Sequence, residues 1–385
     1  MSLTKYTLAM PRVIYSGENA LENITTILAD HYKKVVVFTD KGVLATGLLT
    51  LPLELIKKSG TEYEILEDLP VEPSCDQAQA IIDLFKEMKA DFIIAIGGGS
   101  VMDIAKLASI SVTDDYCVRD LLDNPGRGKK FVKTLMIPTT AGTGSEATPN
   151  SIVLVPEKEL KVGIVNSEMI ADYVILDSIM IKKLPRKIAA ATGLDALCHA
   201  IECYTSNKSN YFSDTFALEA LKLIMNNIEE SCTGPEAVEA KNAMMIASFY
   251  GGVAITASGT TAVHALSYPL GGKYHIPHGV SNAMLLVPVM KFNESMCRER
   301  FGRIYDAVNP GSASMTIEEK SKWIVNRLDE IVTNLEIPRR LDEFGVKKED
   351  LEELVNAGMQ VTRLLVNNMR EVTADDARKI YLEIL

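Results

Sequence analysis

Up to about residue 183 of this 385-residue chain, short apolar runs alternate with helical stretches, and beyond that point only helical patterns follow. Residues 74–89 show helical spacing, with Ile81, Ile82, Phe85 and Met88 on one face. Strands that alternate with helices predict a mostly parallel sheet covered on both faces. The expected strands are 33–40 and 171–177, together with 90–100 and 132–146, which both run into glycines, and a strand pair at 151–157 and 160–167.

The second half of the chain predicts an all-helical domain. The change near Leu184–Pro185 is the expected boundary, which gives an α/β nucleotide-binding domain at 1–183 and an all-helical domain at 184–385. Residues 243–258 are the most apolar segment, but they are too short for a membrane span and predict a buried helix. The expected helices are 186–206, 213–231, 239–255, 317–335 and 348–369.

The net charge and the cysteine pattern of the chain limit the classes of function and the cellular compartment that fit it. A net charge of −11 argues against nucleic acid or an anionic membrane as partner. The six cysteines include no CxxC motif, a pattern that favours reduced thiols in a cytosol. The N-terminus lacks the features of a secretory signal. Together these observations predict a soluble cytoplasmic enzyme.

Two glycine turns follow expected strands. Gly97, Gly98, Gly99 and Ser100 stand between a strand and a helix, where backbone N–H groups can face a phosphate. Met102 replaces the last glycine of GxGxxG, and a plain tight turn with Ser100 and Asp103 as a capping pair is the competing interpretation. The second turn, Thr139–Glu146, favours a ligand that lies across the carboxyl edge of the sheet.

Asp40 ends an expected strand on the same edge. An acid there can accept hydrogen bonds from ribose hydroxyls and would repel a 2′-phosphate, so it favours NAD over NADP. A helix-capping aspartate is the alternative interpretation. Lys161 is a further candidate for a cofactor contact, although a strand lysine is also commonly solvated.

One carboxylate and three imidazoles form a candidate metal site. Asp195 and His199 are four residues apart, which places them on one helix face, and His264 and His278 follow in a stretch rich in proline and glycine. Such a set suits a divalent transition ion. On spacing alone a hydrogen-bonded Asp–His pair and a core histidine remain alternatives, and His275 competes with His278.

The motifs AIGGGSVMDIAK, IPTTAGTGSE, GLDALCHAIE and HALSYPLGGKYHIPHG resemble the iron-containing (group III) alcohol dehydrogenases, and the resemblance covers the whole chain. It implies that family's fold, with the α/β domain followed by the helical metal domain. It also implies metal ligands at Asp195, His199, His264 and His278, and cofactor contacts at Asp40, Gly97, Gly98, Gly99, Ser100, Asp103, Thr139, Thr140, Thr143 and Lys161.

Two positions depart from that family. Tyr268 stands where many members carry a second histidine, so it is only a weak candidate for the proton relay. Glu72 stands where many members have asparagine beside the cofactor, which puts one cofactor contact in doubt. Glu202, one turn after His199, is a candidate outer partner of the site, and a surface acid is the alternative.

The expected activity is hydride transfer between a primary alcohol and NAD, with NADP as the lesser alternative. The substrate oxygen is expected on Fe²⁺, or on Zn²⁺ or another divalent ion. A 4-hydroxybutyrate dehydrogenase is the nearest rival, with Lys273 or Arg119 as the carboxylate anchor, and a 1,3-propanediol dehydrogenase is another. A dehydroquinate synthase-like lyase needs a cluster of basic residues for its sugar phosphate substrate, and no such cluster flanks the candidate ligands in this sequence. A non-catalytic sensor of a metal or a nucleotide is the last alternative. A homodimer or larger homo-oligomer is expected.

Overall fold

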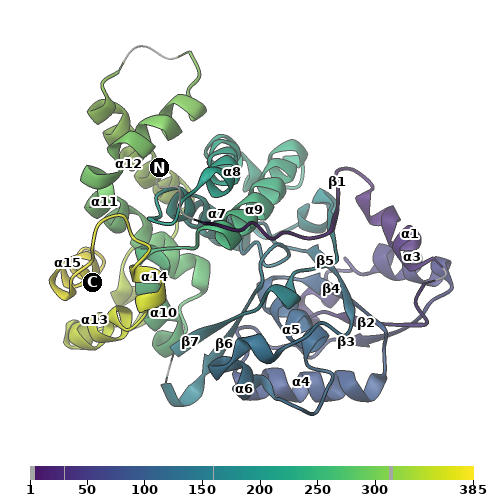
Figure 1. Cartoon of the computed structure of the whole chain (residues 1–385). Helices are drawn as coiled ribbons and strands as arrows, with labels where there is room; N and C mark the ends of the chain where they lie inside the picture. Colours follow the sequence, from purple (N-terminus) through teal and green to yellow (C-terminus); the bar gives the residue numbers. More distant parts are fainter. Residues whose placement is uncertain (1–4, 30, 159, 312–314) are drawn as a thin grey trace. The chain divides into compact units, whose positions relative to one another are not determined.

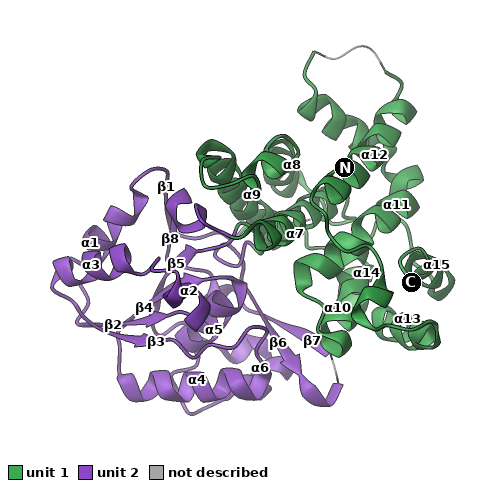
Figure 2. Ribbon diagram, turned by 180° about the vertical axis from the view of Figure 1, so that it is seen from behind, with its two compact units in different colours: residues 1–8, 141–143, 185–385 green, residues 9–140, 144–184 purple. Residues whose placement is uncertain are grey.

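The computed structural model describes residues 5–29, 31–158, 160–311 and 315–385 (Figure 1). The chain forms two compact units (Figure 2): an α/β unit of residues 9–140 and 144–184, and a helical unit of residues 185–385 with 1–8 and 141–143. The units divide between Leu184 and Pro185, where the sequence pattern changes. The short segments 5–8 and 141–143 group with the helical unit. For 141–143 the reason is close packing of Gly142 against Thr192.

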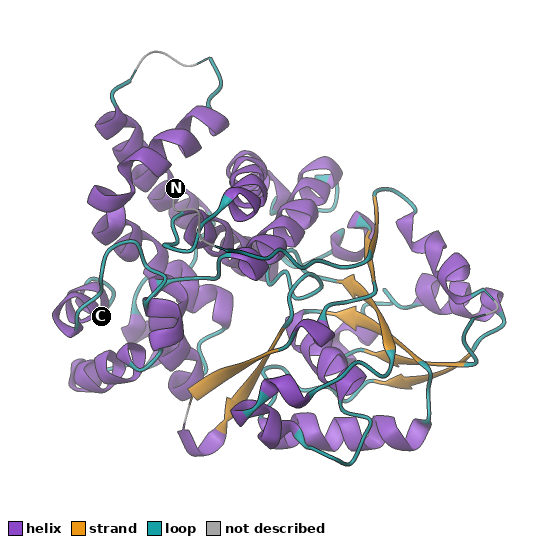
Figure 3. Ribbon diagram, in the orientation of Figure 1, coloured by secondary structure: helices purple, strands orange, loops and turns teal. Residues whose placement is uncertain are grey.

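The α/β unit is built on a six-stranded sheet in the order β1-β8-β5-β4-β2-β3. Figure 3 shows the strands in orange. Every adjacent pair in this sheet is parallel, so the carboxyl ends of its strands share one edge. The strands are β1 (Val13–Ser16), β2 (Lys34–Phe38), β3 (Glu62–Leu66), β4 (Phe92–Gly97), β5 (Lys133–Pro138) and β8 (Tyr173–Leu176).

A separate antiparallel hairpin accompanies the sheet, formed by β6 (Asn150–Val155) and β7 (Leu160–Val165). Helix α5 packs on β4 and β5, and α4 packs on α5. A capping box of Ser74 and Gln77 starts α4 close to the expected residue 74. The α-helices of this unit are α1 (Asn23–Leu28), α2 (Lys41–Ala45), α3 (Thr50–Ser59), α4 (Cys75–Met88), α5 (Gly99–Ile110) and α6 (Val118–Asp123).

The predicted α/β fold class is confirmed, but the sequence pattern missed β1 and β3. These are the two edge strands of the sheet. The residues of β3 alternate between exposed and partly buried, and two of them are glutamates, which strands disfavour. An edge strand is paired on one side only, so it lacks the continuous apolar run that identified the central strands.

The helical unit has α7 at its centre, in contact with α8, α9 and α11. Helix α10 packs against α11 and α13, and α15 packs against α13. Among the described residues after 184 no strand occurs, as predicted. The helices are α7 (Arg186–Tyr204), α8 (Tyr211–Ser231), α9 (Val238–Ala257), α10 (Ala262–Tyr274), α11 (His278–Val308), α12 (Ile317–Asn334), α13 (Leu351–Met359), α14 (Thr362–Leu365) and α15 (Ala374–Leu382).

The Pro/Gly-rich stretch after His264 is helical for most of its length. Helix α10 continues through Pro269, Gly271 and Gly272, all of which are buried, and the chain leaves the helix only at 275–277, before α11 begins. Burial of the helix on several sides compensates for the hydrogen bond that proline removes. The pattern at 348–369 is not one helix, but splits into a short 3₁₀ turn, α13 and α14. In the described parts of the chain no helix has the length and apolarity to cross a membrane.

Candidate metal centre and nucleotide loops

The four predicted metal ligands converge within the helical unit. Asp195 and His199 lie one turn apart on α7, His264 is in the first turn of α10, and His278 is the first residue of α11. Oδ1 of Asp195 is 3.9 Å from Nε2 of His199, 3.7 Å from Nε2 of His264 and 3.6 Å from Nε2 of His278. Three helices therefore direct three imidazole nitrogens toward one carboxylate.

These separations fit coordination of a divalent ion. A tetrahedral ion with bonds of ~2.1 Å places its ligand atoms ~3.4 Å apart, close to the distances seen here. The ligand atoms of Asp195, His199 and His264 all lie within 4.8 Å of one another, and these residues are buried. His278 is the open side of the group, since its side chain is 30% exposed.

The rings of His199 and His264 are oriented by partners at their other nitrogen. Nδ1 of His199 is 3.2 Å from the backbone oxygen of Gly142, and Nδ1 of His264 contacts Oε2 of Glu202. A proton held at Nδ1 leaves the Nε2 lone pair available for a metal, which is the usual arrangement behind a ligating histidine. The donor set and its orientation both suit a metal ion.

Glu202 is a fully buried acid that links α7 to the start of α10. Its Oε1 accepts hydrogen bonds from the backbone N–H groups of Thr261 (2.9 Å) and Val263 (2.9 Å) and from the Thr261 hydroxyl (2.8 Å). Burial alone would raise its pKa, but His264 and the Thr261 bonds outweigh burial and lower the pKa. Glu202 is therefore the outer partner of His264, and the surface-acid alternative is wrong.

Asn282 was missed by the sequence analysis, although it lies in the middle of the ligand group. Its Nδ2 donates to Oδ1 of Asp195 at 2.7 Å and is 3.2 Å from Nε2 of both His264 and His278. Its Oδ1 is buried and has no hydrogen-bond partner within the described parts of the chain. The signal in the sequence was its position four residues after His278, on the same face of α11.

Two glycines allow the close packing that positions these ligands. A Cβ at Gly279 would lie 2.2 Å from the backbone oxygen of Ala191, and a Cβ at Gly142 would lie 2.6 Å from that of Thr192. The start of α11 and the segment 141–143 thus press directly against α7. Thr143 belongs to this same segment of the helical unit.

Four further candidate residues lie outside the set of proposed ligands: Tyr268, His275, Lys273 and Arg119. Tyr268 is buried on α10, with its ring centroid 6.1 Å from that of His278. His275 is exposed at the carboxyl end of α10. Lys273 forms an ion pair with Glu353, and Arg119, in the α/β unit, pairs with Asp76 and Glu157.

Both glycine loops leave adjacent strands at the carboxyl edge of the sheet. Gly97 ends β4 and Gly98 caps α5, while Thr139 follows β5 and donates its N–H to the backbone oxygen of Gly97 at 3.0 Å. A Cβ at Gly97 would lie 2.6 Å from Val101, so this turn requires glycine. A Cβ at Gly98 would lie 3.8 Å from Thr140, which brings the two loops side by side. The start of α5 has the geometry of an anion-binding site.

Asp103 of α5 connects this helix to the second glycine loop and to β6. Its Oδ1 accepts from the Ser145 hydroxyl and lies 2.9 Å from Nζ of Lys106, and its Oδ2 accepts from the N–H of Ile152 at 2.8 Å. Both oxygens are therefore engaged with protein groups. The capping-pair interpretation of Ser100 and Asp103 is wrong, because Asp103 bonds to the second loop instead.

Asp40 is the N-cap of α2, where its Oδ1 accepts from the N–H of Val43 at 2.9 Å. Its Oδ2 has no hydrogen-bond partner among the residues that the structure describes. Lys161 is a nearly buried residue of β7, and its Nζ is 2.6 Å from Oε1 of Glu72. The capping function of Asp40 thus leaves one oxygen available for a ribose hydroxyl.

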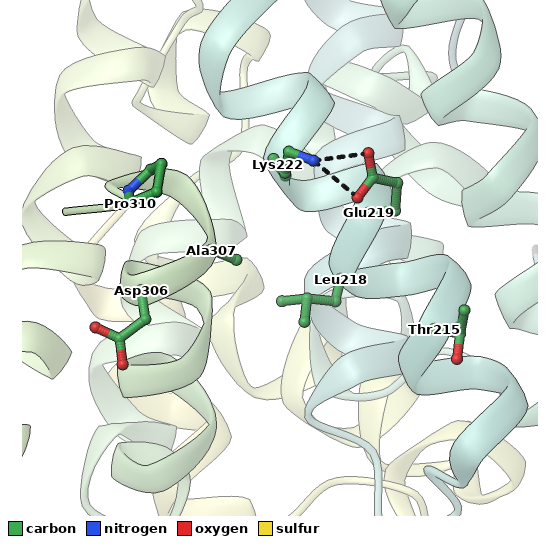
Figure 4. Close-up of a pocket in the computed structure, with 7 residues that line it drawn as sticks. All are labelled: Thr215, Leu218, Glu219, Lys222, Asp306, Ala307 and Pro310. Carbon is green, nitrogen blue, oxygen red and sulfur yellow. Dashed lines mark hydrogen bonds and ion pairs between the residues drawn. The ribbon is translucent and has the colours of Figure 1, made fainter.

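A pocket of about 530 Å³ lies elsewhere in the helical unit, between α8 and the end of α11 (Figure 4). Lys222 and Glu219 form an ion pair at its rim. It contains none of the candidate site residues. Its lining is Thr215, Leu218, Glu219, Lys222, Asp306, Ala307 and Pro310.

Comparison with known proteins gives matches along the whole chain. Residues 11–178 match the model of the iron-containing alcohol dehydrogenases, and residues 189–385 match the model of the C-terminal part of the Fe-containing alcohol dehydrogenase family. Long-chain-alcohol dehydrogenase 1 of Geobacillus thermodenitrificans is 33% identical, with 91% of this chain and 89% of that protein covered.

Two further proteins are similar to this chain. The 4-hydroxybutyrate dehydrogenase of Clostridium kluyveri is 34% identical over 81% of this chain and 84% of that protein. The crystal structure of a 1,3-propanediol oxidoreductase superimposes with a TM-score of 0.92 at 26% identity, and the match covers 99% of this chain and 100% of that one.

Proposed function

This chain belongs to the iron-containing alcohol dehydrogenase family, and from that premise we propose that it is a metal-dependent, NAD-linked alcohol dehydrogenase or aldehyde reductase. The observation that carries the proposal is the buried carboxylate of Asp195, which faces the Nε2 atoms of three histidines from three helices. The proposed ligands are Asp195, His199, His264 and His278. Fe²⁺ is our first choice of ion, and Zn²⁺ or another divalent ion is the alternative.

The bound ion would supply a Lewis acid that favours loss of the alcohol proton, and the nicotinamide would accept the hydride. The contribution of this chain is a preformed ligand cage. Asp195 provides one negative charge, and the Nδ1 partners of His199 and His264 direct the Nε2 atoms of these rings inward. We propose that the alcohol approaches from the His278 side, where the cage is open, and that Tyr268 beside it relays the proton.

On the nucleotide side we propose that Gly97, Gly98, Gly99 and Ser100 hold the pyrophosphate at the start of α5. Asp40 would accept a hydrogen bond from a ribose hydroxyl, which favours NAD over NADP. Thr139, Thr140 and Thr143 are the proposed contacts of the nicotinamide side, and Lys161 is proposed as a further contact of the cofactor. Asp103 would act through Ser145, because its own oxygens are already bonded within the protein.

A primary alcohol or its aldehyde is the proposed substrate. The similarity to the 4-hydroxybutyrate dehydrogenase of Clostridium kluyveri supports an ω-hydroxy acid as the second candidate. Lys273 and Arg119, the expected anchors for its carboxylate, are already paired with acidic side chains in the structure. We therefore favour an uncharged alcohol or diol.

The test is an NADH-absorbance screen with primary alcohols, diols and hydroxy acids, run on protein loaded anaerobically with Fe²⁺ or Zn²⁺. Metal-loaded protein should form NADH with at least one primary alcohol, and chelator-treated protein should lose that activity and regain it on reloading. Absence of NADH formation with every alcohol and both ions would refute the proposal.

We further propose a cytoplasmic location and a homodimeric or larger homo-oligomeric state. All six cysteines are free thiols, which suits a reducing compartment. Closed symmetric homo-oligomers are the commonest assemblies of soluble enzymes. Sedimentation analysis of the purified protein tests the assembly.

A further inference from the structure

Glu72 has a backbone conformation that is unusual for glutamate. Its φ is +52°, in the left-handed region that favours glycine and asparagine. Such a conformation is unfavourable for glutamate and persists only where its surroundings enforce it. The contacts of Glu72 and of its neighbour show what enforces it here.

The loop around Glu72 is tied to two elements of the α/β unit. The N–H of Glu72 donates to Oγ of Ser100 at 3.1 Å, in the first turn of α5. The backbone oxygen of Pro73 accepts from the N–H of Leu154 on β6 at 2.9 Å. Glu72 is therefore fixed beside the glycine loop that begins α5.

The side chain of Glu72 holds the nearly buried amine of Lys161. Nζ of Lys161 lies 2.6 Å from Oε1 of Glu72, with side-chain exposures of 7% and 29%. Within the described parts of the chain, Glu72 is the one ion-pair partner of Lys161. Because the amine is desolvated, it needs a negative partner, and Glu72 supplies it.

A dinucleotide would bring two phosphate charges to this end of α5. The helix N-terminus and Lys161 attract these phosphates, whereas the carboxylate of Glu72 repels them. The same carboxylate is already paired with the amine of Lys161. From these contacts we infer that Glu72 is an internal counter-anion, which holds Lys161 in the cofactor-free enzyme and lowers the affinity for the dinucleotide. The inference rests on the NAD binding proposed above.

Removal of the charge should therefore strengthen cofactor binding. Glu72→Gln keeps the size of the side chain and frees Lys161 for the phosphates. The pair is only partly buried, so the expected gain in NAD⁺ affinity is roughly threefold to tenfold. The gain should be larger at low ionic strength, because salt screens the repulsion.

The experiment is titration calorimetry of NAD⁺ against the full-length protein at two salt concentrations. Four variants join the wild type: Glu72→Gln, Glu72→Asn, Lys161→Met and the double variant Glu72→Gln/Lys161→Met. Asparagine tolerates the left-handed backbone, so Glu72→Asn keeps the test valid if the glutamine variant folds poorly. Glu64→Gln is the matched control, since it removes an acid that pairs with Lys34 across β2 and β3.

We expect tighter binding in both Glu72 variants, weaker binding in Lys161→Met, and no change in Glu64→Gln. The Glu72→Gln change should strengthen binding less in the Lys161→Met background than in the wild type, because only the repulsion is relieved and no amine remains to be released. Unchanged or weaker binding in both Glu72 variants would overturn the inference, as would an equal gain in the Lys161→Met background. A wild type that binds no NAD⁺ would instead refute the proposed function.

Discussion

Glu202 contacts Nδ1 of His264 through one carboxylate oxygen, while its other oxygen accepts hydrogen bonds from the backbone N–H groups of Thr261 and Val263 at the start of α10. This single buried acid both orients a proposed metal ligand and caps the helix that carries it. The ligand geometry is therefore set by a residue that need not touch the ion.

Glu202→Gln should weaken metal binding by about 10- to 100-fold, because His264 loses the charged partner that fixes its ring. The measurement is metal affinity by competition with a chromophoric chelator. Glu219→Gln removes an exposed acid of α8 and serves as the control. An unchanged metal affinity in Glu202→Gln would show that the contact does not support the site.

Asn282→Ala should destabilise the metal-free protein more than the metal-loaded protein. In the variant, the carboxylate of Asp195 and the Nε2 atoms of His264 and His278 lose their hydrogen-bond donor. This should lower the free energy of unfolding of the metal-free protein by about 1–3 kcal/mol, and a bound ion would offset the loss. Thermal unfolding with and without metal measures the difference. Asn293→Ala is the matched control, since this buried residue of α11 bonds to Asn368 instead. Equal losses in both states of Asn282→Ala would contradict the assignment.

Asp40→Asn should relax the preference for NAD over NADP by about tenfold, because the 2′-phosphate no longer meets a negative charge. Asparagine can still cap α2 through the N–H of Val43. The measurement is the ratio of kcat/KM for the two cofactors. If the ratio stays at the wild-type value, Asp40 acts only as a helix cap.

Glu146→Gln should change how stability depends on pH. Burial raises the pKa of Glu146 from 4.5 to about 7, so the folded protein binds this proton more tightly than the unfolded chain. The favourable contribution of Glu146 is present below about pH 4.5 and is lost as the pH rises through about 7. Relative to Glu146→Gln, the wild type should lose roughly 3 kcal/mol over that interval.

Urea unfolding of both proteins across this pH range measures the effect. The exposed acid Glu87 of α4 provides the control variant Glu87→Gln, which reports the pH dependence common to the whole chain. Parallel pH profiles for wild type and Glu146→Gln would show that Glu146 stays ionised in the folded protein.

The sequence predicted the central strands, the glycine turns and the change to helices because each is a local pattern. Continuous apolar runs mark β2, β4 and β5, and glycines follow where the backbone turns tightly. The half-exposed strands β1 and β3 carry no such run, so they were missed. Helix α10 continues through Pro269 because its buried surroundings outweigh the local preference.

Spacing and the family resemblance indicated the candidate ligands and the glycine loops. They could not indicate hydrogen-bond partners that come from distant segments of the chain. The i+4 spacing places Asn282 on the same face of α11 as His278, but its contacts with Asp195 and His264 come from two other helices and are seen only in the folded structure. Asp103 was expected at the cofactor, but its partner Ser145 is 42 positions away in the chain. The pairing of Lys161 with Glu72 likewise spans 89 positions, so only the folded structure shows it.

Asp195 and three histidines are proposed to hold the catalytic ion, and the metal content of His264→Ala tests this ligand set. Bound metal per protein and NADH-linked turnover should both fall far below the wild-type values in this variant. They should stay unchanged in His275→Asn, which alters an exposed histidine of the same stretch. A His264→Ala protein with full metal content and full activity would contradict the account.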